Sequence, residues 1–212
     1  MKKFPANLEF LNPCLVLEEA DAQMAQVPNE RLFVDANPNY RKLFERWCAG
    51  SFGVGYGRFI APCEVAVNDE RTRVDADFFL RVRESIFAFQ TVEVLEEGRL
   101  RSDEYRSPGP TPYEPERGAM EGPGWLEAGV QRKLDKRYAG AGDLHILAYA
   151  NFTAENLQFA DVARRLGRFR GKFASLWVMA FHVFGSICST PELGSTDGWR
   201  TFRTPHDWNT GV

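Results

Sequence analysis

The chain has 212 residues, of which 44% are hydrophobic and 26% charged, and its formal net charge is −3. A chain of this length and composition can bury a substantial core, so disorder along its whole length is excluded. The slightly acidic balance removes any argument from bulk basicity for nucleic-acid binding, which would have to use local basic patches.

Neither a membrane span nor an export signal is expected. The longest nearly apolar run covers residues 173–184 and is interrupted by His182, whereas a transmembrane helix needs about 20 apolar residues. The chain begins with two lysines, but Pro5 and Glu9 interrupt what would be the apolar region of a signal peptide. The four cysteines form no C-x-x-C pair, which is typical of reduced thiols. We therefore expect a cytoplasmic protein.

The first third of the chain predicts a helix followed by strands. Residues 1–36 are a mixed lead-in with a short helix near 18–26. Asn37 is a good N-cap for a helix with an aromatic stripe that ends at Gly50. The glycine-rich segment 50–57 lacks the G-x-G-x-x-G spacing and is predicted to be a turn. Three strand patterns follow, and the last two are close enough to form an antiparallel hairpin. They cover residues 59–67, 74–82 and 86–94.

The rest of the chain alternates between helix and strand patterns. Five prolines and four glycines between Ser107 and Gly124 predict a loop. Apolar residues then recur with helical spacing in two segments, which are separated and followed by apolar strands. The helices cover 125–138 and the segment from Thr153, as N-cap, to Phe169, and the strands cover 143–152 and 173–184.

The order of these elements indicates an α/β protein. Three meandering strands come first, and each later strand is reached through a crossover helix. This order is typical of a mixed central sheet flanked by helices on both faces. We expect one core over residues 37–184, preceded by the lead-in and followed by a C-terminal coil, residues 185–212, that packs on it.

Side-chain alternation in the hairpin predicts a cluster of carboxylates. Asp75 and Asp77 alternate with the apolar positions of their strand, and Glu93 does so on the next strand. If the apolar faces match across the ladder, the three carboxylates share one face. Oxygen ligands of this kind suit Mg²⁺ or Mn²⁺. The alternative is a solvated acidic face with Arg81 as a partner, which is the commoner fate of acids.

Three segments resemble the PD-(D/E)XK superfamily of restriction-endonuclease-like proteins. They are VDADFF (74–79), FQTVEVLEEGRLRSDEYR (89–106) and VQRKLDKRYAGAGDLHILAYANF (130–152), and the last two are similar to divergent bacterial members. The resemblance covers residues 37–184. It implies a restriction-endonuclease-like αβββαβ core with an extra helix–strand unit, and metal-dependent hydrolysis of phosphodiester bonds.

The resemblance also implies roles for individual residues. Asp77 would be the metal-ligating acid of the first hairpin strand, and Glu93 or Gln90 would stand for the acid of the second. The family's lysine should lie two residues beyond that acid, but Val92 and Leu95 occupy the two candidate positions. In the family this lysine orients water and stabilises developing negative charge, so another element of this chain would have to supply an equivalent cation.

Basic residues that could replace this lysine or contact phosphate follow the candidate site and continue on the next helix. Arg99, Arg101 and Lys133 are candidates for the missing lysine, and Arg137 joins them as a candidate substrate-binding residue. An ordinary basic helix surface is the alternative interpretation. Glu45 of the first helix is a further candidate metal ligand, although a solvated helical acid is commoner.

These observations lead to a hypothesis and two alternatives. The hypothesis is a nuclease acting on DNA or RNA, with Mg²⁺ or Mn²⁺ held by Asp77 and Glu93, and with Gln90 and Asp75 adjacent. The first alternative is an inactive relative that keeps the fold for nucleic-acid binding or protein interaction. The second is an accessory protein unrelated to nucleic acid, whose carboxylate face is merely solvated.

Overall fold

A computed structural model of the chain describes residues 7–26, 38–68, 76–99, 113–136 and 143–202. Its helices are α1 (Pro13–Met24), α2 (Pro38–Phe59), α4 (Pro115–Asp135), α5 (Phe159–Leu166) and the short 3-10 helix η2 (Gly167–Phe169). Its strands are β1 (Glu64–Val67), β2 (Phe78–Val82), β3 (Ser85–Val94), β4 (His145–Ala150), β5 (Ser175–Ala180), β6 (Val183–Cys188) and β7 (Arg200–Thr201).

The seven strands of the described residues form one mixed sheet in sequence order. Strands β1, β2 and β3 are antiparallel neighbours, β3, β4 and β5 are parallel, and β5, β6 and β7 are again antiparallel. The two parallel steps are the ones that contain a crossover helix, as parallel pairing requires. This confirms the predicted α/β class with a mixed central sheet.

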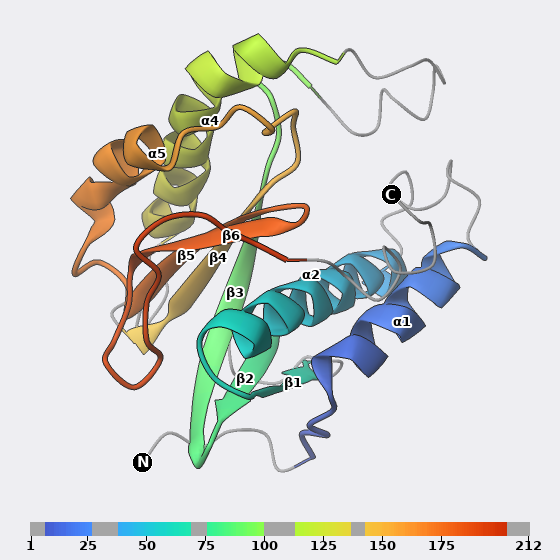
Figure 1. Cartoon of the computed structure of the whole chain (residues 1–212). Helices are drawn as coiled ribbons and strands as arrows, with labels where there is room; N and C mark the ends of the chain where they lie inside the picture. The colour runs from blue at the N-terminus through green and yellow to red at the C-terminus, as the bar shows by residue number, and fades with distance from the viewer. Residues whose placement is uncertain (1–6, 27–37, 69–75, 100–112, 137–142, 203–212) are drawn as a thin grey trace.

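Helices cover both faces of the sheet, as predicted (Figure 1). On one face Phe52 of α2 lies 5.3 Å from Phe89 and 5.4 Å from Trp177, measured between ring centroids. On the other face Val92 and Val94 pack in a core with α4 and α5. Helix α1 packs against α2. Each face of β3 and β4 is therefore buried under a helix layer.

The glycine-rich segment 50–57 is helical, so its prediction as a turn is wrong. Helix α2 continues to Phe59 because its glycines face neighbouring elements. A Cβ at Gly50 would lie 2.8 Å from the Leu17 backbone nitrogen, and one at Gly53 would lie 2.8 Å from the Pro13 side chain. These glycines allow α1 to approach α2 closely, and the packing outweighs their low helix propensity.

The predicted loop over residues 107–124 is also partly wrong, since α4 begins at Pro115 and contains Pro123. A Cβ at Gly118 would lie 1.8 Å from the carbonyl oxygen of Thr153, and one at Gly122 would lie 2.6 Å from the Phe152 ring. The glycines are thus contact points between α4 and the segment after β4. The predicted helix 125–138 forms the second half of α4.

The apolar run 173–184 was predicted as one strand but forms most of a hairpin. Phe181, with φ of 46°, and His182 make the turn between β5 and β6. Strands β6 and β7 then occupy part of the segment predicted as coil. Helix α5 begins at Phe159 with Gln158 as its N-cap, so Thr153 does not cap it.

Of the predicted strands, one hairpin is confirmed and one strand is shorter than predicted. The β2–β3 hairpin is confirmed, with Arg83 and Glu84 in its turn. The strand predicted at 59–67 is reduced to β1, because α2 extends through Phe59. All four cysteines are free thiols. Among the helices of the described ranges, none combines the length and apolar character needed to cross a membrane.

Candidate functional site

The β2–β3 register differs from the one that matching apolar faces predicted. Phe78 lies opposite Phe89 and Leu80 opposite Phe87, so the apolar face of β2 joins the phenylalanine face of β3, beneath α2. The prediction had matched it with the opposite face, which carries Val92. Aromatic packing against α2 decides the register, since Phe78 and Phe89 stack with centroids 5.0 Å apart.

Asp77 lies one residue before β2 and closes the hairpin. Its backbone N–H donates to the carbonyl oxygen of Phe89 at 2.8 Å. Its carboxylate Oδ2 accepts a hydrogen bond from the backbone N–H of Thr91 at 2.7 Å. The side chain therefore continues the ladder beyond the last paired residues and is held against β3.

The two faces of β3 separate the candidates Gln90 and Glu93. Phe87 and Phe89 pack beneath α2, whereas Val92 and Val94 pack beneath α4. Alternation then assigns Thr91 and Glu93 to the α2 face, and Gln90, which is 5% exposed, to the α4 face. Because Phe78 lies opposite Phe89, Asp77 falls in line with Gln90. By alternation Asp77 and Glu93 are therefore on opposite faces, and the prediction that these carboxylates share one face is wrong.

Glu93 is held by the segment that follows β4. Asn151 Nδ2 donates to Glu93 Oε1 at 2.7 Å. The carbonyl oxygen of Asn151 in turn accepts from Arg99 Nη1 at 2.8 Å, and Arg99 lies 3.8 Å from Glu96. The predicted candidate Arg99 is thus linked to Glu93 through Asn151. Sequence reasoning did not single out Asn151, which is marked only by its position directly after a buried strand.

Helix α2 brings a lysine to Asn68, whose backbone pairs with that of Asp77. Lys42 Nζ donates to the carbonyl oxygen of Asn68, and the Asn68 backbone N–H donates to the carbonyl oxygen of Asp77 at 3.0 Å. Lys42 also lies 3.0 Å from Glu45 Oε2. Glu45 is only 4% exposed, so the expectation of a solvated acid at this position is wrong. The three-residue spacing of Lys42 and Glu45 was the sequence signal for this pair.

The other predicted site residues lie away from these contacts or outside the described ranges. Lys133 is half-buried on α4, which covers the opposite face of the sheet from α2. Arg81 pairs with Glu64 of β1, its Nε lying 2.7 Å from Glu64 Oε2. The residues Asp75, Arg101 and Arg137 lie outside the described part of the chain.

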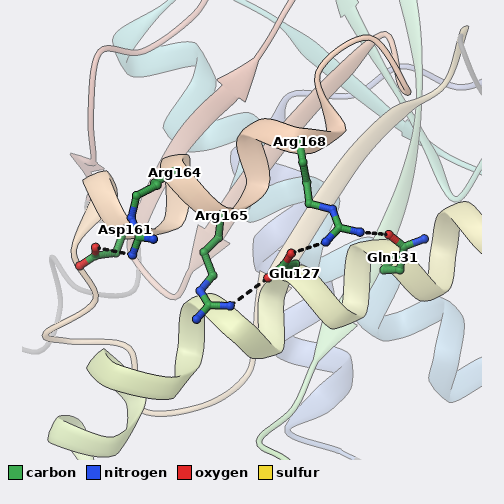
Figure 2. A network of polar contacts seen from close by, with 6 residues as sticks. All are labelled: Glu127, Gln131, Asp161, Arg164, Arg165 and Arg168. Atoms are coloured by element: carbon green, nitrogen blue, oxygen red, sulfur yellow. Dashed lines mark hydrogen bonds and ion pairs between the residues drawn. The ribbon is translucent and has the colours of Figure 1, made fainter.

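Two arginines of the basic segment 164–172 link α5 and η2 to α4 (Figure 2). Arg165 and Arg168 both donate to the carboxylate of Glu127, at 3.0 and 2.7 Å. Arg168 also reaches Gln131 at 2.8 Å, and Arg164 pairs within α5 with Asp161 at 3.2 Å. These arginines therefore have a structural role.

The donor chemistry near Asp77 is compatible with a divalent cation. Asp77, just before β2, is held on the Thr91 N–H, and Glu93 lies two residues farther along β3. Mg²⁺ commonly uses one or two carboxylates together with water and phosphate oxygens. Within the described ranges, no group of three or more His, Cys, Asp or Glu side chains is arranged to hold a metal ion.

Comparison with known proteins gave no match to a family model, a curated protein or a solved structure.

Proposed function

We propose that the protein is a divergent PD-(D/E)XK-like nuclease that uses Mg²⁺ or Mn²⁺ held by Asp77 and Glu93 to hydrolyse phosphodiester bonds of DNA or RNA. The observation that carries the proposal is the position of Asp77, whose carboxylate is fixed on Thr91 two residues before Glu93. The element order also supports it, because a helix, an antiparallel β-meander, a helix and a parallel strand follow one another.

In this proposal Lys42 takes the role of the missing lysine. Val92, which lies at the family's lysine spacing from Gln90, is buried beneath α4. Lys42 instead comes from α2 and contacts the backbone carbonyl of Asn68, and the backbone N–H of Asn68 donates to the backbone carbonyl of Asp77. An ammonium group there would orient the attacking water and stabilise negative charge that develops on phosphate.

The remaining residues have supporting roles. The metal ion would supply an activated water and neutralise charge on the scissile phosphate. Glu45 holds the Lys42 ammonium, and Asn151 holds the Glu93 carboxylate. Arg99, fixed by the Asn151 carbonyl, would contact a phosphate of the substrate.

The test is cleavage of labelled single- and double-stranded DNA and RNA in Mg²⁺, in Mn²⁺ and in chelator. Asp77→Asn and Glu93→Gln are compared with Glu84→Gln, which changes an exposed acid in the hairpin turn. We expect metal-dependent cleavage that both site variants lose and the control keeps. Cleavage that survives in folded Asp77→Asn and Glu93→Gln would refute the assignment.

The alternative is an inactive nuclease-like module that binds nucleic acid or a protein. The observation in its favour is that both carboxylates already hold structure, Asp77 through Thr91 and Glu93 through Asn151. It requires binding without turnover and binding that is insensitive to Asp77→Asn. Absence of cleavage by folded protein in every arm of the experiment would favour this alternative.

A further inference from the structure

A cavity of about 590 Å³ opens beside the candidate site, where β4 and β5 end. It lies at the carboxyl ends of parallel strands, which is the common place for ligand sites in α/β sheets. The residues that matter for its chemistry come from four separate segments. They are Arg99, Asn151, Phe152, Phe181, His182 and Trp199.

Two aromatic rings in the wall of the cavity are fixed by their neighbours. Phe152 packs edge-on against Trp125, with ring centroids 5.1 Å apart. The Trp199 indole N–H donates to the carbonyl oxygen of Leu157 at 2.8 Å, and its ring packs edge-on against Phe159 at 5.1 Å. Rings held in this way form a preformed apolar wall, which reduces the entropy lost when a flat ligand binds.

A third ring, Phe181, lies in the β5–β6 turn and is 58% exposed. Its φ of 46° is in the left-handed region, where hairpin turns ordinarily use Gly or Asn. A bulky residue in this conformation is an outlier of the kind that clusters at ligand sites. The turn presents the ring among the residues that line the cavity.

The polar part of the lining connects the cavity to Glu93. Arg99 contributes a side chain that is 17% exposed and whose guanidinium donates to the Asn151 carbonyl. Asn151 lines the cavity and donates to Glu93. The imidazole ring of His182 also lines the cavity and lies beside the Phe181 ring. Aromatic walls, a fixed cation and contact with the candidate site thus occur in one place.

We infer that this cavity binds one nucleotide, with the base stacked on the Phe181 ring and the phosphate directed to Arg99. Aromatic side chains stack on any unpaired base, and a guanidinium recognises phosphate oxygens. The nucleotide can come from a single strand or be free in solution, and both share this chemistry. The inference rests on the proposed function, since it names an unpaired nucleotide next to the scissile bond as part of the substrate.

The experiment measures binding in chelator, so that no turnover is needed. The probes are fluorescein-labelled oligo(dT) and oligo(U), followed by anisotropy, and the mononucleotides AMP and UMP, followed by tryptophan fluorescence. The main variant is Phe181→Gly, because glycine tolerates the positive φ and the fold should be kept. Phe59→Ala is the matched control, since Phe59 is 41% exposed on α2 and does not line the cavity.

We expect Phe181→Gly to weaken binding at least about fivefold, in line with alanine substitution at stacking platforms, and Phe59→Ala to leave it unchanged. Loss with the oligonucleotides alone identifies a strand as the source, and loss with the mononucleotides identifies the free nucleotide. Binding that Phe181→Gly leaves intact, or no binding of any probe, overturns the inference. If the inference fails in this way but metal-dependent cleavage is observed, the proposed function still stands. If binding depends on the cavity but no cleavage occurs, only the proposed function is refuted.

Discussion

The Asp77 carboxylate accepts a hydrogen bond from the Thr91 backbone N–H at 2.7 Å and so links the start of β2 to the second half of β3. The contact takes the place of a strand-to-strand bond at the point where the hairpin opens. Any role of Asp77 in chemistry must therefore coexist with a role in stability.

Replacement of Asp77 by alanine should destabilise the protein, because the Thr91 N–H loses a charged acceptor. A hydrogen bond to a charged group contributes about 1.5–3 kcal/mol to the free energy of unfolding, and we expect a loss in that range. Asp77→Asn keeps an acceptor oxygen and should lose less. Urea unfolding of both variants, with Glu84→Ala as the exposed control, measures the difference. Equal stability of wild type and Asp77→Ala would contradict this role.

On the proposed function, Lys42→Gln should slow cleavage by roughly 10²–10³, the effect of removing one preorganised donor to developing charge. Lys42→Arg keeps the cation beside Glu45 and should recover part of the rate. Lys136→Gln, an exposed lysine after α4, is the control for general loss of charge. The measurement is single-turnover cleavage, with thermal unfolding to verify that each variant is folded. A wild-type rate in Lys42→Gln would remove Lys42 from the site.

Two glycines of α4 should respond to alanine with opposite signs. At Gly118 a Cβ would lie 1.8 Å from the carbonyl oxygen of Thr153, so Gly118→Ala should reduce the free energy of unfolding by about 1–3 kcal/mol or more. At Gly124 the nearest neighbouring atom is 3.9 Å from such a Cβ, so alanine should stabilise by about 0.5–1 kcal/mol. Denaturant unfolding of the pair tests the packing of α4, and the same sign for both would contradict it.

The Glu127 carboxylate joins α4 to α5 and η2 through two arginines, and its loss should have a small, salt-dependent effect. Arg165 and Arg168 are about half exposed, and exposed ion pairs contribute about 0.2–1 kcal/mol each. Glu127→Ala should therefore lower stability by about 1 kcal/mol in low salt and by less in high salt. Glu121→Ala, which removes only a pair with Arg117 on the same helix, is the control. A loss independent of salt would contradict an ionic origin.

Stability should fall at alkaline pH because of Cys63. Burial raises the pKa of its thiol from the ordinary 9.0 to about 12, and the Sγ lies 3.3 Å from the carbonyl oxygen of Gly53. Between these two values the folded chain keeps a proton that the unfolded chain has released. The free energy of unfolding therefore falls as pH rises, by at most about 1.4 kcal/mol per pH unit from this group. Cys63→Ala should show a shallower decline in urea unfolding measured across this range, and identical slopes would contradict the assignment.

Some elements could be predicted because their signal is local. The run of β-branched and aromatic residues over 86–94 indicated β3, whose neighbouring residues point to opposite buried layers. The α/β class followed from the order of strands and helices. The ends of the helices were harder to predict from the sequence. The glycines of α2 and α4 are typical of turns, and only the structure shows which neighbouring residues pack against them.

The sequence by itself determined the fold class and the order of most strands and helices, because periodicity and chain order are properties of local segments. Only the tertiary structure decided which face of β2 joins which face of β3, since Phe78 and Phe89 must share the layer under α2. It likewise decided that Lys42 reaches Asn68 and that Asn151 holds Glu93. The last two contacts join residues 26 and 58 positions apart, and packing between layers, which no local pattern records, brings them together.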